Sequence, residues 1–464
     1  MNGERLTANG RSVRRTATAE DDDGLITSVW VTTMSFLFLL GSLLPGQCIA
    51  APELIVDIDF NDEVYIRPEP MTEAEVEKLV RDLHAHGCQT LLVRMGYLGY
   101  LPYHTDLSYP IGFDVEHARA HGANSSAIGD LDKYIESHIA WNEKYARVLA
   151  AFNPPEVFIR IGHELGMKVV MWLDIFDDGF PGYRSKFIDE HPQCQWTAKD
   201  GQTRFEGLIS YAWPEARAFR VAQATELLDL GADGIHCSTS AHCRHLPNPG
   251  GVDFYGYEDP IVAEYRQRYG VDIRTAEDFD KEAWHTIKGE AQNSLYRELA
   301  AVCHERGKEL WVGLQLGDYT QMCAPLYFGD NGVARYRNLW RELVDEGIAD
   351  AFILGDYELC TQPGTPYWKA KGDEIGAAAD LFSWAAEHYQ SHCRGRTKLY
   401  TFGEWLSGNR RQVDAKLKLL ADKTVGNGFD GIDVHEAMNF EGSGMDLLRR
   451  MAERLAGRDP GELE

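Results

Sequence analysis

A short apolar run followed by a segment of helical periodicity recurs eight times between residues 51 and 455, which limits the fold more than any other feature. Alternating strands and helices predict a parallel sheet, because each helix returns the chain to the same end of the sheet. Eight such units, with no GxGxxG motif after the first strand, favour a closed barrel over a doubly wound sheet. The predicted fold is an α/β protein, a (β/α)₈ TIM barrel with long βα-loop insertions. The expected strands are 54–60, 90–95, 168–175, the run that begins at Gly231, 309–316, 351–354, 398–402 and 431–434.

Capping and turn residues place helices between these runs. Thr72 and Glu75 form a capping box at the start of the first helix, and Pro214 suits the first turn of another. The residues from 96 to 150 predict a long, ordered loop rich in tyrosine. The remaining expected helices are 155–165, 333–346, 373–392, 412–425 and 445–455, with 259–269 and 281–306 in an insertion after the fourth strand.

The N-terminal residues have the pattern of an export signal. No charged residue occurs between Gly24 and Pro52, and small residues near Ala50 suit a cleavage site, with Arg14 and Arg15 upstream. The apolar run approaches the ~20 residues that span a bilayer, so retention as a membrane tether is the competing interpretation. We predict that residues 1–50 form a signal peptide or anchor, that residues 51–464 form one barrel domain, and that the protein is secreted or periplasmic.

Charge and cysteine content narrow the partners. A formal net charge of −26 repels phosphate backbones and argues against nucleic acid, but it does not exclude a carbohydrate substrate. The chain has no CxxC motif, which argues against a zinc ribbon or thioredoxin-like site. Cys88, Cys303 and Cys393 are expected to be small buried residues. The expected rim loops carry Cys194, Cys243, Cys323 and Cys360, where an oxidising compartment would permit a disulfide.

Polar side chains follow most of the expected strands, and in a barrel these strand ends meet at one rim. Glycoside hydrolysis needs one carboxyl group to protonate the leaving oxygen and a second to attack or stabilise the anomeric carbon. We predict Glu404 as nucleophile or base and Asp356 or Glu358 as the opposing acid. The predicted substrate-binding residues, including tryptophan platforms for sugar rings, are Arg94, Asp174, Asp177, His242, Trp172, Trp405 and Glu436.

Several of these acidic residues have structural alternatives. Asp57 and Asp59 could form a polar layer at the bottom of the barrel rather than bind a ligand. Asp174 and Asp177 could cap a turn or pair with Arg184. The two DGI sequences, at Asp233 and Asp430, place their aspartates in turns at the amino ends of strands, so we exclude both from the site.

The histidines and cysteines after the fourth strand do not predict a metal. Their spacing matches no zinc pattern, and His236 and Cys237 point to opposite sides of a strand. We therefore expect no metal and no cofactor, and His242 is expected to bind substrate. A metal-dependent hydrolase that uses His242, His245 and strand-end aspartates is the alternative.

Six short motifs, in order along the chain, resemble the glycosyl-hydrolase-like family 10 barrels of bacterial envelope proteins. They are WLDIFDD, HPQCQWTAKDG, YAWPEARAF, DGIH, DPIVAEYRQRYGVDI and DGIDVHEA. The resemblance implies an exported (β/α)₈ hydrolase acting on a glycan, with bacterial cell-wall glycan as one target class. The chain departs from the family after DGIH, where Cys237 and Ser238 stand in place of a hydrophobic residue and an Asp. Acid–base chemistry would then fall to Asp356, Glu358, Glu404 or Glu436. If catalysis is lost, the chain would be a non-catalytic carbohydrate-binding protein.

Overall fold

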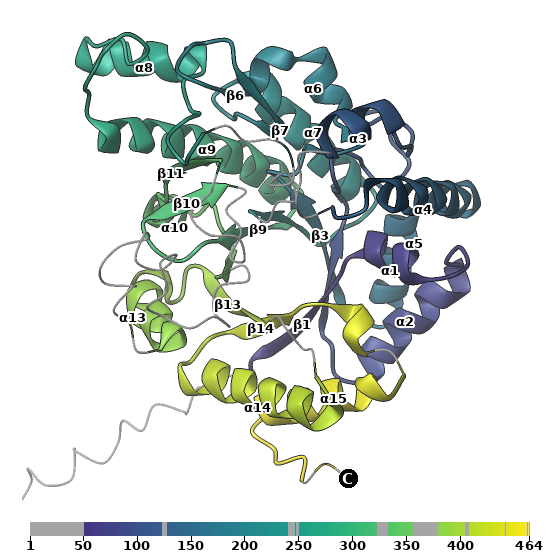
Figure 1. Cartoon of the computed structure of the whole chain (residues 1–464). Coiled ribbons are helices and arrows are strands. Elements are labelled where there is room, and N and C mark those ends of the chain that lie inside the picture. Colours follow the sequence, from purple (N-terminus) through teal and green to yellow (C-terminus); the bar gives the residue numbers. More distant parts are fainter. Residues whose placement is uncertain are drawn as a thin grey trace, which may run out of the picture. The chain divides into compact units, whose positions relative to one another are not determined.

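The computed structural model shows eight parallel strands closed into a barrel, which confirms the predicted fold (Figure 1). It describes residues 51–122, 128–239, 246, 250–322, 333–355, 378, 380–403, 408–440, 442–461 and 463. Each strand pairs with its neighbour in chain order, and the last strand pairs with the first. The barrel strands are β1 (Glu53–Ile58), β2 (Thr90–Arg94), β3 (Lys168–Asp174), β8 (Gly234–Ser238), β9 (Glu309–Leu314), β12 (Ala351–Leu354), β13 (Lys398–Gly403) and β14 (Gly431–Val434).

Helices surround the barrel and return the chain between strands (Figure 1). The first of them begins with the predicted capping box, in which the Thr72 side chain accepts from the Glu75 N–H and the Glu75 carboxylate accepts from the Thr72 N–H. Its apolar face buries Val76, Leu79 and Leu83. The surrounding helices are α2 (Glu73–Ala85), α5 (Pro154–Glu164), α7 (Pro214–Asp229), α9 (Lys281–Glu305), α10 (Trp340–Asp345), α13 (Leu381–Cys393), α14 (Arg410–Gly426) and α15 (Met445–Leu455).

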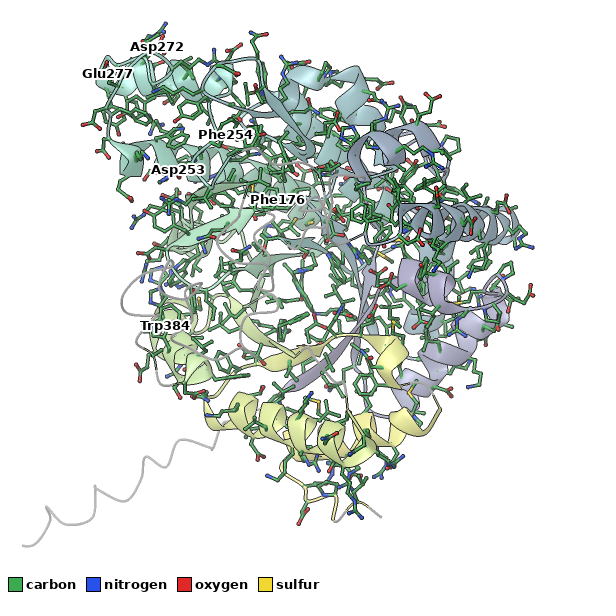
Figure 2. All side chains as sticks on the ribbon, viewed as in Figure 1. Phe176, Asp253, Phe254, Asp272, Glu277 and Trp384 are labelled. Carbon is green, nitrogen blue, oxygen red and sulfur yellow. The ribbon has the colours of Figure 1, made fainter. Side chains whose placement is uncertain are left out.

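Additional elements lie in the connections that follow the strands. Asp272 and Glu277 mark the outer part of the insertion after β8, and Asp253 and Phe254 lie closer to the barrel (Figure 2). The additional helices are α1 (Phe60–Ile66), α3 (Val115–Gly122), α4 (Leu131–Ala151), α6 (Lys186–Glu190) and α8 (Asp259–Tyr269). The two-stranded pairs are β4 (Gly179–Phe180) with β5 (Tyr183–Arg184), β6 (Gln195–Thr197) with β7 (Arg204–Ile209), and β10 (Tyr319–Met322) with β11 (Ala334–Arg337).

Alternation along each strand separates an outer core from an inner one. On β1, Leu54 and Val56 pack in the outer cluster, whereas Ile55 belongs to the inner cluster with Trp172, Trp311 and other residues. Because successive side chains point to opposite faces, Asp57 follows Ile55 on the inward face. The same periodicity places Arg94 on the inward face of β2 and Asp174 on that of β3, so these polar groups lie at the carboxyl end of the barrel interior.

Three parts of the chain differ from the expectation. The predicted loop from 96 to 150 contains two helices, α3 and α4. The expected helix 333–346 is wrong in its first half, because residues 334–337 pair with β10 as strand β11. The first strand ends at Ile58 rather than Phe60, because Asp59 caps α1 by accepting hydrogen bonds from the Asn61 and Asp62 N–H groups.

The cysteines in the described part of the chain are unpaired. Cys88, Cys303 and Cys393 are buried as expected, and Cys194 and Cys237 are buried as well. The other rim-loop cysteines, Cys243, Cys323 and Cys360, lie outside the described residues. Within the described ranges, no helix combines the length and apolar character needed to cross a bilayer.

Candidate active site

Arg94 is the centre of a buried charge network at the carboxyl end of the barrel. Its Nε donates to Asp174 Oδ2 at 2.5 Å, its Nη2 donates to Asp177 Oδ2 at 3.2 Å, and its Nη1 donates to Asp59. All four side chains are buried, with Arg94 only 3% exposed. Burial alone would lower the pKa of Arg94. The negative charges of Asp174, Asp59 and Asp177 outweigh this effect, and the pKa lies well above its ordinary value. Arg94 therefore stays charged and joins the ends of β1, β2 and β3.

Trp172 supports this network from inside the barrel. Its Nε1 donates to Asp174 Oδ1 at 2.8 Å, and the Arg94 guanidinium lies 5.0 Å from its ring centroid. The side chain is only 3% exposed. Arg94 packs against the indole, so little of the ring is open to a ligand, and the role of Trp172 as a sugar platform stays a prediction.

The aspartates that follow β1 and β3 lie at the carboxyl end of the barrel and have defined partners. Asp57 and Asp59 lie at the carboxyl end, so the barrel-bottom interpretation is wrong for both. Asp174 and Asp177 bind Arg94, whereas Arg184 lies 3.4 Å from Asp114 and 3.5 Å from Asp189. The neighbouring Asp178 makes a separate buried pair with Arg220 of α7 at 2.5 Å.

A second pair of titratable side chains, His435 and Glu436, comes from the end of β14. His435 Nδ1 lies 2.9 and 3.0 Å from the two carboxylate oxygens of Asp57. Glu436 follows directly through a cis peptide bond, is 8% exposed, and has its Oε2 3.8 Å from His435 Nε2. Burial, with repulsion from Asp59, Asp62 and Asp57, raises the pKa of Glu436 to about 9 although His435 opposes the shift. Burial and Asp59 likewise raise the pKa of Asp62 to about 7.

The fourth barrel strand contributes a buried histidine, and its described residues carry no carboxylate. His236 on β8 is 4% exposed and lies edge-on to Trp172, with ring centroids 6.4 Å apart. Burial lowers the pKa of His236 to about 3, so the ring is neutral at physiological pH. The strand ends at Ser238, which faces Asp174 of β3 in register.

The structure brings together part of the predicted site. Arg94, Asp174, Asp177, Trp172 and Glu436 all lie at the carboxyl end of the barrel. The other predicted residues, Glu404, Asp356, Glu358, His242 and Trp405, lie outside the described residues, and their roles stay predictions. Two groups were missed, His435 and Asp62. His435 could have been predicted from its place beside Glu436 directly after β14. Asp62 could be placed at the site only once helix α1 was known.

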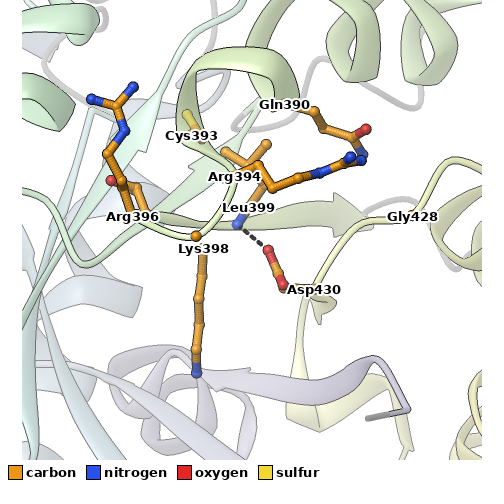
Figure 3. Close-up of a pocket in the computed structure, with 10 residues that line it drawn as sticks. Gln390, Cys393, Arg394, Arg396, Lys398, Leu399, Gly428 and Asp430 are labelled. Atoms are coloured by element: carbon orange, nitrogen blue, oxygen red, sulfur yellow. Dashed lines mark hydrogen bonds between the residues drawn. The ribbon is translucent and has the colours of Figure 1, made fainter. Parts of the chain in front are cut away.

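The amino end of the barrel has a different character. Asp233 accepts from the Val169 N–H at 3.0 Å and Asp430 from the Leu399 N–H at 2.8 Å, as expected for structural turn residues. A pocket of about 330 Å³ opens beside Asp430 and is lined by Arg394 and Lys398 among others (Figure 3). It lies at the start of β13, at the opposite end from the Arg94 network, so it is not part of the candidate active site.

Comparison with known proteins gives only distant similarities to solved structures. No protein-family model and no curated protein matches the chain. The chain is similar to the β-amylase catalytic domain from Paenibacillus polymyxa, at 11% identity and TM-score 0.48, covering 88% of this chain and 99% of that one. It is also similar to the endo-1,4-β-mannanase from Rhizomucor miehei, at 10% identity and TM-score 0.45, covering 88% and 95%. The activities belong to the proteins so named, and the barrel fold of this chain is shown by its own strand pairing.

Proposed function

We propose that this chain is an exported glycoside hydrolase, related to the glycosyl-hydrolase-like family 10 barrels, that cleaves a poly- or oligosaccharide at the carboxyl end of its barrel. The observation that carries the proposal is the convergence of acidic side chains from β1, β3 and β14 around Arg94 and His435. Catalytic residues of TIM barrels come from the ends of several strands at this face. Carboxyl groups in contrasting environments are also what acid–base cleavage of a glycosidic bond uses.

The proposed roles divide between two layers of the site. Glu404 would act as nucleophile or base, with Asp356 or Glu358 as the opposing acid. Glu436 and the more exposed His435 and Asp62 would contact sugar hydroxyls. Arg94, Asp174 and Asp177 hold one another below this layer, so their contribution would be to position the groups that touch the sugar.

The test is a screen for reducing ends released from cell-wall and storage polysaccharides by wild-type protein and by Glu404→Gln. We expect wild-type activity on at least one glycan and at least a 100-fold loss in kcat for the variant, because a missing nucleophile or base cannot be replaced by an amide. Asp422→Asn, on the outer helix α14, is the matched control and should keep wild-type activity. An active Glu404→Gln protein would refute that residue's role.

Export is a separate part of the proposal, supported by the uncharged stretch from Gly24 to Pro52. Expression of the full chain followed by fractionation and N-terminal sequencing tests it. We expect envelope or extracellular protein that begins near Ala51. An intact N-terminus in the membrane fraction would favour the anchor, and intact cytoplasmic protein would refute export.

A non-catalytic carbohydrate-binding protein is the second candidate. The end of β8 favours it, because residues 234–239 contain no carboxylate where the resembling family has an Asp. This candidate predicts measurable binding of an intact oligosaccharide and no product after prolonged incubation. If wild-type protein releases reducing ends and Glu404→Gln does not, the non-catalytic candidate is eliminated.

A further inference from the structure

Three carboxylates from opposite ends of the sequence meet at the rim of the barrel. Asp59 and Asp62 lie at the start of α1, directly after β1, and Glu436 follows β14. Because β14 pairs with β1, with Val434 opposite Val56, closure of the barrel brings these groups together. One carboxylate oxygen from each of the three lies within 4.8 Å of the other two.

Glu436 provides an independent sign that this cluster is incomplete. Its residue is only 8% exposed, yet its Oε1 has no hydrogen-bond partner among the described residues. A buried polar atom without a partner costs about 1–3 kcal/mol, so such atoms are rare in native structures and need an explanation. The carboxylate belongs to the cluster with Asp59 and Asp62, where a bound cation would supply its partner.

The charges around the cluster also favour a cation. In the described part of the mouth, Arg94 and His435 are the basic groups that face the carboxylates of Asp57, Asp59, Asp62, Asp174, Asp177 and Glu436. Six carboxyl groups therefore face two basic groups, an excess that a bound cation would offset. Arg94 is already bound by Asp59, Asp174 and Asp177, and His435 by Asp57. Neither provides a direct hydrogen bond to Glu436 Oε1.

We infer that Asp59, Asp62 and Glu436 form a calcium site. All three ligands are carboxylate oxygens, the donor type that hard divalent cations take. Calcium–oxygen distances of 2.3–2.6 Å allow ligand oxygens up to about 5 Å apart, whereas the shorter magnesium bonds allow only about 4 Å. The three oxygens lie no more than 4.8 Å apart, within the span that Ca²⁺ allows. Ca²⁺ also accepts irregular coordination rich in carboxylates, whereas Mg²⁺ requires near-ideal octahedral geometry and usually keeps several waters. Asp62 is only half-buried, which leaves a route from solvent.

A second group with metal-ligand chemistry does not support the same inference. His117, His121 and Glu206 also lie within 4.8 Å of one another. However, His117 Nδ1 accepts from the Gly182 N–H at 2.9 Å, so in the neutral ring the proton is on Nε2, the atom that faces Glu206. A protonated ring nitrogen cannot ligate a metal. Glu206 therefore offers a matched control carboxylate outside the calcium site.

The experiment is calorimetric titration of chelator-treated protein with CaCl₂, and it measures binding without any glycan. We expect one Ca²⁺ per wild-type chain, at least tenfold weaker Mg²⁺ binding, and a melting temperature that rises with Ca²⁺. Glu436→Gln and Asp62→Asn should each weaken Ca²⁺ binding by tenfold or more. Glu206→Gln should bind as wild type does. Circular dichroism confirms that each variant is folded, and Asp62→Asn serves alone if Glu436→Gln does not fold.

Several results would overturn the inference. They are no Ca²⁺ binding by wild type up to millimolar concentration, undiminished binding in both Glu436→Gln and Asp62→Asn, or Mg²⁺ binding as tight as Ca²⁺. A parallel titration with glucosamine tests an organic cation at the same carboxylates. If the protein binds glucosamine but not Ca²⁺, the cation that these carboxylates recognise is an ammonium group and not a metal. Because no hydrolysis is measured, failure of the glycosidase proposal leaves this test intact.

Discussion

The two ends of the barrel use aspartates in opposite ways. At the amino end, Asp233, Asp350 and Asp430 each precede a strand and accept a hydrogen bond from a backbone N–H of the adjacent strand. At the carboxyl end, the aspartates face one another across Arg94 and His435. Partial burial would raise the pKa of Asp233, but hydrogen bonds from Val169, His163 and Lys308 outweigh it and lower the pKa. At the mouth, burial dominates, and the pKa of Glu436 rises. Carboxylates at the amino end therefore stabilise the fold, whereas the described part of the mouth holds more carboxyl groups than basic groups to pair with them.

The largest effect is expected from Arg94→Met. Removal of the guanidinium leaves Asp59, Asp174 and Asp177 buried without their counter-charge. Breaking a buried ion pair from one side typically costs about 3–5 kcal/mol, and we expect a loss of that size in the free energy of unfolding. Urea denaturation at pH 7 measures it. Arg94→Lys keeps the charge but not the forked geometry and should lose less; equal stability of wild type and Arg94→Met would contradict the network.

His236→Gln should change the acid sensitivity of the mouth. Below pH 6.5 the unfolded chain binds a proton at this histidine, whereas the folded chain does so only near pH 3. Wild-type stability is therefore lost as pH falls through this window, by about 1.4 kcal/mol per pH unit. Between pH 6.5 and 4.5 the variant should be spared roughly 2–3 kcal/mol of that loss. Chemical denaturation at several pH values checks the slope, and identical pH profiles would show that His236 is not the buried base.

At the amino end, Asp233→Ala should cost about 2 kcal/mol, the scale of hydrogen bonds to a charged acceptor. The carboxylate loses its bonds to the Val169 N–H, His163 and Lys308. Because the folded pKa is lowered, this stabilisation is present near neutral pH and disappears in acid, so the variant and wild type should converge below pH 4. Asp233→Asn retains one acceptor and should lose less. A change in glycan binding by any Asp233 variant would break the separation between the two ends.

The smallest effect is a gain. In chelator-treated protein, Glu436→Gln should raise the free energy of unfolding by about 1 kcal/mol. The amide carries neither the desolvation cost of a buried carboxylate nor its repulsion from Asp59 and Asp62. Thermal or urea denaturation without divalent cations measures it. Destabilisation under these conditions would show that the carboxylate is held by partners rather than crowded by like charges.

Local sequence patterns predicted most of the strands and helices but few of the contacts in the charge network. Capping at Thr72 and alternation in β1 and β3 depend on neighbours in sequence, so the strands and most helices were predictable. Helix α4 was missed because its buried face includes Asn142 and Lys144, which weaken the apolar periodicity. Strand β11 was missed because its structure depends on pairing with β10 and on α9, where a side chain at Gly289 would collide with the Arg337 carbonyl.

The candidate site likewise has a part that the sequence predicted and a part that it did not. Strand-end positions identified Arg94, Asp174 and Glu436 as inward polar groups. No spacing in the sequence indicated that Asp174 would bind Arg94 rather than Arg184, or that Asp62 would lie beside Glu436. These contacts depend on which strands become neighbours when the barrel closes and on how α1 leaves β1, neither of which is encoded within one segment.

The pairing of β1 with β14 gives the mouth a role in the order of synthesis. Asp57 and Asp59 are among the earliest parts of the barrel to leave the ribosome, and His435 and Glu436 are among the last. A nascent chain that has made seven strands has neither the imidazole for Asp57 nor the third carboxylate for Asp59 and Asp62. Ca²⁺ could therefore bind at this rim only after the last strand has joined the barrel. A chain that stops before Gly431 would have the Arg94 network but would lack His435 and Glu436.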